Sequence, residues 1–201
     1  MADREGSIYY QNYSSFDFDK ACTFLGKEEI YIVNEPHDGK IFALGNLGNE
    51  YQASYEEVKQ KALSGQIFNV IIWLNYQKQI YWTFRSQNNY LIIDFYLGFL
   101  SQKERDKVSR AFTKFFFSEI VSNPLSILGM FIDKNGRTHD YSFDPVFLTN
   151  SEEVDYVTDL ICLPKEKFNL VVMEPGFAMK ELENDFFCAS RYPEFLNYLM
   201  S

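Results

Sequence analysis

Residues 67–97 constrain the fold of this chain more than any other segment. The run 67–76 is apolar on both faces, as a central strand is, and the runs 79–85 and 89–97 alternate between apolar and polar side chains. Only short polar turns separate the three runs, whereas parallel strands need a connection of about a dozen residues or more. The segment therefore predicts a three-stranded antiparallel meander.

Two pairs of strand-like runs and two helices surround this meander. Hairpins are predicted at 30–44 and at 127–143, the second around an Asn135-Gly136 turn, which is a strong hairpin signal. Helices are predicted near 54–64 and 101–121, because each begins with a serine followed three residues later by a glutamate, the pattern of a capping box. Connections this short leave no room for β-α-β units, so we expect an α+β fold with a mostly antiparallel sheet.

The 201 residues fit a single globular domain, 1–201. Residues 1–7 are polar, and we expect them to be frayed. Residues 151–201 are predicted to be an acidic C-terminal part of the same domain. Within it, 151–161 fits either a helix or a strand, 168–173 a strand and 192–200 a short helix.

Aromatic residues make up 18% of the chain, and rings of this size are mostly buried. The predicted core consists of the apolar faces of the meander and of the 101–121 helix. Its members are Val70, Ile72, Leu74, Trp82, Phe84, Leu91, Ile93, Phe95, Phe112 and Phe115.

The cysteines Cys22, Cys162 and Cys188 are odd in number and far apart, which predicts free, buried thiols rather than a disulfide framework. The first residues lack the apolar stretch of a secretory signal, and no apolar run approaches 18 residues. We therefore expect a cytoplasmic protein that does not enter a membrane.

No motif for catalysis, metal binding or a cofactor stands out. The two histidines, His37 and His139, are isolated, and no CxxC or HxxxH spacing occurs. The glycines Gly45 and Gly48 follow a strand without the lysine that completes a phosphate-binding loop. The sequence predicts no catalytic residue, no metal site and no cofactor.

One polar group on the meander is a candidate pocket. Asp94 is the only acid on its predicted strand, and it shares a face with Tyr90 and Tyr96. Such a cluster is typical of a small-ligand or enzymatic site as well as of a half-exposed structural aspartate.

Acidic charge is concentrated near the end of the chain. Residues 151–201 contain ten acidic and four basic residues, so they carry six of the nine net negative charges. Glu152, Glu153, Asp155 and Asp159 form a dense group, which favours a basic protein as partner and disfavours nucleic acid. A basic stripe, Lys103, Lys107, Arg110 and Lys114, is predicted on the exposed face of the 101–121 helix.

In acidity, aromatic content and lack of catalytic motifs, the chain resembles small bacterial immunity proteins. This resemblance implies a non-catalytic module that occludes a basic toxin through acidic and aromatic contacts. Two alternatives stay open: an enzyme or small-ligand protein using the Tyr90, Asp94 and Tyr96 group, and a structural or assembly component. The sequence does not indicate an oligomeric state.

Overall fold

The computed structural model describes residues 5–45, 47–137, 142–149, 158–168 and 176–197. Its helices are α1 (Phe18–Lys27), α2 (Tyr55–Ala62), α3 (Gln102–Ser122), α4 (Asp144–Leu148), α5 (Lys165–Phe168) and α6 (Pro193–Asn197), with 3₁₀ turns η1 (Tyr13–Ser15), η2 (Glu35–His37), η3 (Pro124–Ser126) and η4 (Glu183–Asp185). Its strands are β1 (Glu5–Tyr10), β2 (Ile30–Tyr31), β3 (Ile41–Leu44), β4 (Glu50–Ala53), β5 (Phe68–Leu74), β6 (Lys78–Gln87), β7 (Tyr90–Tyr96), β8 (Ile127–Asp133), β9 (Leu160–Pro164), β10 (Ala178–Glu181) and β11 (Phe186–Ser190).

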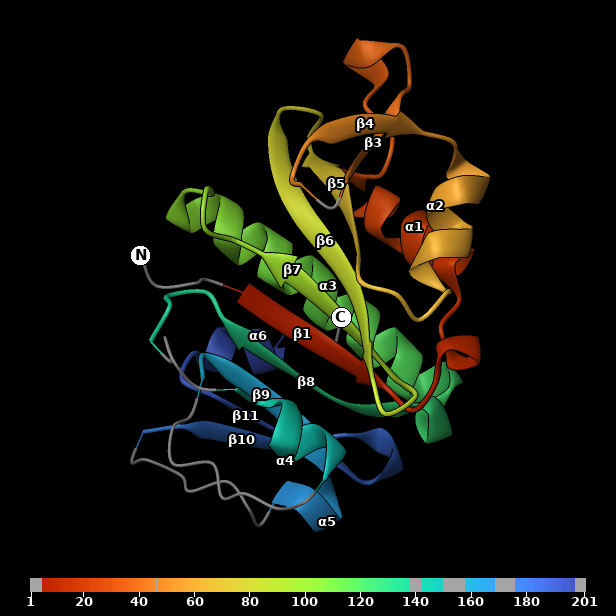
Figure 1. The fold of residues 1–201 in the computed structure, drawn as a ribbon. Helices are drawn as coiled ribbons and strands as arrows, with labels where there is room; N and C mark the ends of the chain where they lie inside the picture. The colour runs from red at the N-terminus through yellow and green to blue at the C-terminus, as the bar shows by residue number, and fades with distance from the viewer. Residues whose placement is uncertain (1–4, 46, 138–141, 150–157, 169–175, 198–201) are drawn as a thin grey trace.

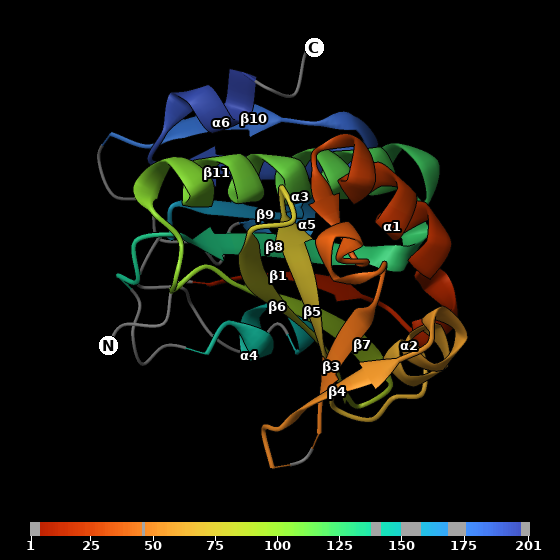
Figure 2. The same ribbon diagram turned by 90° about the horizontal axis from the view of Figure 1, so that it is seen from above.

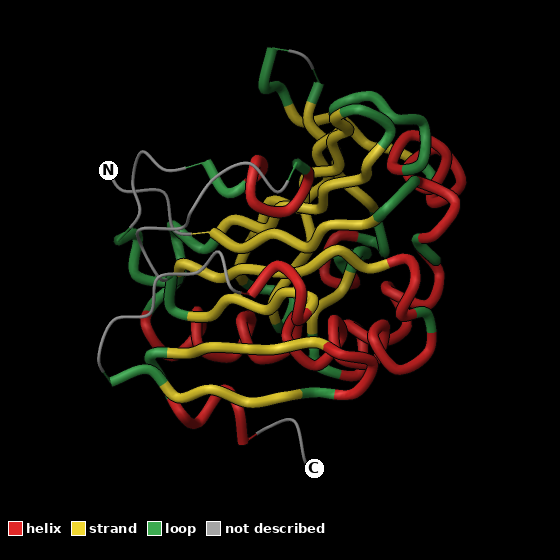
Figure 3. Tube along the Cα trace, turned by 90° about the horizontal axis from the view of Figure 1, so that it is seen from below, coloured by secondary structure: helices red, strands yellow, loops and turns green. Residues whose placement is uncertain are grey.

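The eleven strands form one antiparallel sheet in the order β10-β11-β9-β8-β1-β7-β6-β5-β3-β4, with β2 on β5 (Figures 1 and 3). The α+β class and the antiparallel sheet agree with the prediction. The predicted meander is present as β5, β6 and β7, paired in sequence order. In this order β10 and β4 are the two outer strands, at opposite ends of the sheet.

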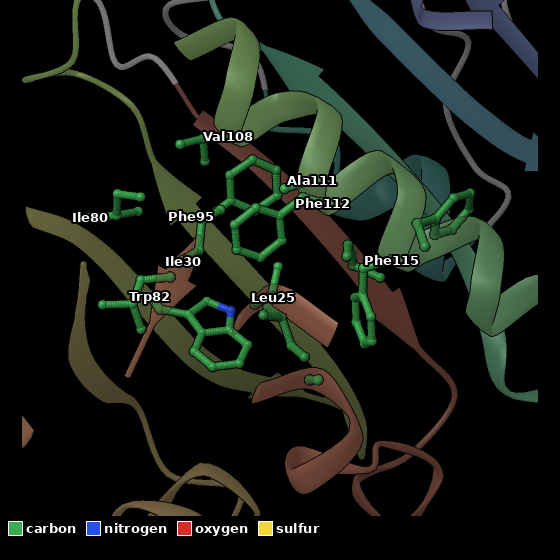
Figure 4. Packing of buried hydrophobic residues seen from close by; sticks show 14 of the residues in the cluster. Leu25, Ile30, Ile80, Trp82, Phe95, Val108, Ala111, Phe112 and Phe115 are labelled. Atoms are coloured by element: carbon green, nitrogen blue, oxygen red, sulfur yellow. The ribbon is translucent and has the colours of Figure 1, made fainter. Parts of the chain in front are cut away.

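Helices cover both faces of the sheet. Figure 2 shows α1 and α3 on one side and α4 on the other. The larger core lies between the sheet and α1, α2 and α3, and it contains all ten predicted core residues (Figure 4). A smaller core lies under α4, where Phe147 stacks on Tyr9 with ring centroids 4.0 Å apart.

Two helix starts are confirmed. The hydroxyl of Ser101 accepts from the Glu104 amide, and the Glu104 carboxylate accepts from the Ser101 amide, so α3 begins with a complete capping box. The hydroxyl of Ser54 caps α2 through the Glu57 amide. Each cap satisfies amides that the first helical turn leaves without an intrahelical partner.

The predicted fraying of residues 1–7 is wrong from Glu5 onward, because β1 begins there. β1 lies in the middle of the sheet, paired with β7 on one side and β8 on the other. Gly6 allows this position, since a Cβ atom there would lie 2.2 Å from the ring of Phe95. Residues 1–4 lie outside the described residues.

The predicted hairpin at 30–44 differs from the observed pairing, and the one at 127–143 is only partly within the described residues. In the 30–44 segment, β2 pairs with β5, and only an Asn34–Lys40 bridge joins the two arms. In the 127–143 segment, the Asn135-Gly136 turn forms and the first arm is β8, which pairs with β1 and β9, whereas residues 138–141 of the second arm lie outside the described residues. In the 30–44 segment, long-range pairing with β5 has overridden the local hairpin preference.

The expectation of three free thiols is wrong for two of the cysteines. Cys162 of β9 and Cys188 of β11 form a disulfide, and they lie directly opposite each other in the antiparallel pair. Their separation of 26 residues gives no local signal, because only the sheet topology brings the two strands together. Cys22 is a free thiol, and its burial raises its pKa to about 12.

Candidate functional site

Asp94, the centre of the predicted pocket, is buried at 4% exposure in a charged network. Its Oδ1 accepts a hydrogen bond of 2.6 Å from the Ser7 hydroxyl, and its Oδ2 accepts one of 2.6 Å from the Nε of Arg85. Ser7, Asp94 and Arg85 belong to the neighbouring strands β1, β7 and β6, so the sheet itself fixes their positions.

Arg85 also binds a second carboxylate, which belongs to α4. Its Nη1 and Nη2 donate to the two oxygens of Asp144 at 2.6 and 2.9 Å, and the hydroxyl of Tyr9 donates to Asp144 at 2.9 Å. One guanidinium therefore connects the sheet to α4 through two aspartates. Burial raises the pKa of Asp94 against the opposing effect of Arg85, while the two aspartates together raise the pKa of Arg85.

This network leaves little room for the predicted pocket chemistry. Both oxygens of Asp94 are occupied by Arg85 and Ser7, and Tyr90 and Tyr96 are half-buried on the same strand. Three hydrogen bonds, one from Ser7 and two from Arg85, use most of the acceptor sites of this buried carboxylate. The geometry is that of a structural ion-pair network that holds α4 against the sheet.

The predicted acidic group is only partly within the described residues. Glu152, Glu153 and Asp155 lie outside them, and Asp159 is fully buried rather than exposed. The Asp159 carboxylate accepts from the amide and the side chain of Asn135, at 3.0 to 3.2 Å, and so holds the turn that follows β8. Burial raises the pKa of Asp159 above its ordinary value.

The basic stripe on α3 faces a neighbouring helix rather than only solvent. Lys114 forms an ion pair of 2.9 Å with Glu28, and Lys107 pairs with Glu29, both just after α1. These pairs reduce the positive charge that the stripe offers to a partner. Their effect is to dock α1 beside α3.

A different surface combines acidic charge with exposed apolar side chains. We define the turn surface as the exposed residues Val121, Leu125, Glu166, Glu181, Glu183 and Asp185, around the β10–β11 turn and the C-terminal end of α3. The β10–β11 turn and the end of α3 lie side by side in Figures 1 and 2. The side-chain amide of Asn184 donates to the backbone carbonyl of Ile120 at 2.9 Å. Val121 is 61% exposed and Leu125 is 87% exposed, so the turn surface offers apolar contact area next to its acids.

Two grooves flank the turn. A groove of about 250 Å³ lies on one side, lined by Phe117, Ile120, Val121, Lys180, Glu181, Leu182 and Glu183. A larger one of about 620 Å³ lies on the other side, and its walls include Pro124, Leu125, Leu128, Pro164, Asp185 and Phe186. The acidic turn therefore separates two partly apolar depressions.

The acids of the turn surface are mostly available to a partner. Within the described chain, Glu166, Glu183 and Asp185 take part in none of the ion pairs, and Glu181 makes a long, exposed contact of 3.4 Å with Lys165. Two nearby lysines point elsewhere: the ammonium of Lys167 donates to the carbonyl of Phe147, and that of Lys180 to the carbonyl of Leu196. Sequence reasoning missed this surface, although three acids within residues 181–185 were a signal for it.

Among the described residues, no three His, Cys, Asp or Glu side chains are grouped so that they could hold a metal ion. None of the described helices is long and apolar enough to cross a membrane. Comparison with family models, with curated proteins and with solved structures finds no match.

Proposed function

We propose that this protein is a non-catalytic binding module that occludes a basic partner protein, in the manner of an immunity protein, through the turn surface. The observation that carries the proposal is the pair of partly apolar grooves divided by an acidic turn. Interfaces of this kind combine apolar anchors, which supply affinity, with charges, which supply selectivity and fast association.

The turn surface has the chemistry that the sequence assigned to Glu152, Glu153, Asp155 and Asp159. The turn surface takes the place of Asp159 in the proposed interface, because the Asp159 carboxylate already accepts hydrogen bonds from Asn135. Charge close to exposed apolar groups suits a partner with lysine or arginine beside an apolar side chain, because the stem of either residue can lie along apolar surface.

Hydrogen bonds hold the β10–β11 turn in place in the free protein, which favours tight binding. Leu182 donates its amide to the carbonyl of Phe186 at 2.7 Å, and the Asn184 side chain anchors the turn to α3. A surface that is rigid before binding loses less conformational entropy when the complex forms.

The alternative of an enzymatic or small-ligand site at Tyr90, Asp94 and Tyr96 is weaker, because Asp94 is buried and accepts three hydrogen bonds from Arg85 and Ser7. A cytoplasmic location and avoidance of nucleic acid stay predictions from composition. The Cys162–Cys188 disulfide bears on the first of these, since disulfides are rare in reducing compartments, and fractionation of the native cell tests it.

The proposal is tested by affinity capture from the native cell with three forms of the protein. These are the wild type, Glu183→Lys/Asp185→Lys, and a control, Glu35→Lys/Glu56→Lys, which changes the net charge equally at exposed positions elsewhere. We expect a basic protein that the wild type and the control retain and the turn variant loses. Equal recovery by all three forms, or recovery of acidic proteins only, would contradict the proposal.

A further inference from the structure

We infer that a second copy of this chain pairs with β4, so that two sheets join across a two-fold axis into one continuous sheet. This inference does not depend on the proposed function. β4 and the turn surface belong to opposite ends of the strand order, so a dimer through β4 leaves the turn surface open.

β4 is an outer strand with unused hydrogen-bonding groups. In the described chain it pairs only with β3, and Figure 2 shows the β3–β4 hairpin projecting from the body of the molecule. The amide of Gly45 donates to the carbonyl of Asn49 at 2.9 Å, which fixes the alternation of the ladder. Counting from that bond, the main-chain groups of Tyr51 point toward β3, and those of Glu50 and Gln52 point outward.

The outward groups fit a second β4 in one register. When Tyr51 lies opposite Tyr51 of the second copy, Glu50 lies opposite Gln52, and the four outward residues close two hydrogen-bonded rings. The Gln52 side-chain amide then faces the Glu50 carboxylate twice, and the two Tyr51 rings form a close aromatic pair. The strand is therefore complementary to itself in both backbone and side chains.

Neighbouring registers are worse. One shift places Glu50 directly opposite Glu50 of the second copy, and like charges in that position repel. The opposite shift brings Glu50 against Ser54, where the chain has already turned into α2. The charge next to the axis is also balanced, because Lys61, which contacts the Tyr51 hydroxyl at 2.8 Å, forms an ion pair with Glu57.

Exposed apolar side chains near this edge indicate that it is covered in the assembled protein. Leu47, at the tip of the hairpin, is 95% exposed, and Ile67, on the adjoining loop, is 73% exposed. A groove of about 280 Å³ lies between hairpin and loop, lined in part by Leu44, Tyr51, Ile67 and Phe68. Exposed edges of this kind are templates for pairing with another strand.

Sedimentation velocity over roughly 1–500 μM tests the dimer, since small interfaces associate in that range. The diagnostic variant is Gln52→Pro, which removes an outward amide and leaves the bonds to β3 intact. Loss of two hydrogen bonds per dimer should weaken association about five- to 150-fold. The matched control Gln52→Ala keeps the backbone donor and should weaken association only about threefold.

Register is tested by charge at the same position. Gln52→Lys places a lysine opposite Glu50 twice and should tighten the dimer about two- to 30-fold, whereas Gln52→Glu should weaken it by a similar factor. Far-UV circular dichroism and melting curves identical to those of the wild type establish that each variant folds. In the wild type, amide exchange at Glu50 and Gln52 should slow as concentration rises.

A wild type that stays monomeric over the whole range would overturn the inference. A dimer that Gln52→Pro and Gln52→Ala affect equally would overturn it too, because the contact would then lie elsewhere. Tightening by Glu50→Gln would contradict the register, since it would indicate that Glu50 faces its own copy.

Discussion

Replacing Arg85 by methionine should destabilise the protein strongly, because two buried carboxylates would lose their shared counter-charge. The guanidinium makes four hydrogen bonds, at 2.6 and 3.3 Å to Asp94 and at 2.6 and 2.9 Å to Asp144. Removal of one partner from a buried ion pair costs about 3–5 kcal/mol. The side chains of Asp94 and Asp144 are only 6% and 16% exposed, so solvent can replace little of what is lost.

The pH dependence of this loss tests its cause. Without Arg85, burial and the neighbouring charge of Asp144 hold the pKa of the Asp94 carboxyl above its unfolded value. Such groups favour folding below the unfolded pKa and lose that contribution as the pH rises through the folded pKa. The deficit of Arg85→Met in the free energy of unfolding should therefore be largest near neutral pH and shrink as the pH falls toward about 4.

Equilibrium unfolding in urea at several pH values measures both effects. The control is Arg85→Met/Asp94→Asn/Asp144→Asn, which carries no charge at these three positions and should recover about half of the loss at neutral pH, with no such pH dependence. A cost below about 1 kcal/mol, the range of exposed ion pairs, would refute the argument that solvent replaces little of what Arg85 provides to the two carboxylates. An equal cost at all pH values would refute the assigned origin of the loss.

Three further predictions concern stability. Phe112→Ala should cost about 3–5 kcal/mol in urea unfolding, because Phe112 is fully buried and stacks on Phe95 at 4.0 Å (Figure 4); a cost below about 1 kcal/mol would contradict its place in the core. Cys162→Ala/Cys188→Ala should lower the free energy of unfolding by about 3.5 kcal/mol, from the loop of 26 residues that the disulfide closes, whereas stability unaffected by the substitution would contradict a formed disulfide. Gly6→Ala should cost about 1–3 kcal/mol by displacing Phe95, and a neutral effect would show that the ring moves freely.

Local sequence signals predicted the parts of the fold that local contacts determine. The meander of β5 to β7 has short turns and clear alternation, and α3 has a capping box, so both follow from neighbouring residues. β1 was missed because Gly6 and Ser7 look like part of a polar terminus. Their fitness for the sheet depends on Phe95 and Asp94, nearly ninety residues away in sequence.

The candidate surfaces were harder to predict for the same reason. The acids of residues 181–185 are visible in the sequence, but their meaning comes from Val121 and Leu125, which α3 and η3 bring beside them. β4 was overlooked because its polar alternation, Glu50-Tyr51-Gln52-Ala53, is that of an edge strand and lacks the apolar content of a central one. Asp159 was predicted to be exposed because the sequence does not show that it is buried and hydrogen-bonded to Asn135.

The proposed function requires that the turn surface attracts and holds a basic partner. The direct measurement is the association rate of the captured partner with the wild type, Glu183→Lys/Asp185→Lys and Glu35→Lys/Glu56→Lys at low and high ionic strength. We predict that the turn variant associates about tenfold or more slowly than the other two at low salt, and that the difference shrinks at high salt as screening increases. Equal association rates for the turn variant and the control at low salt would contradict the account and remove the turn surface from the interface.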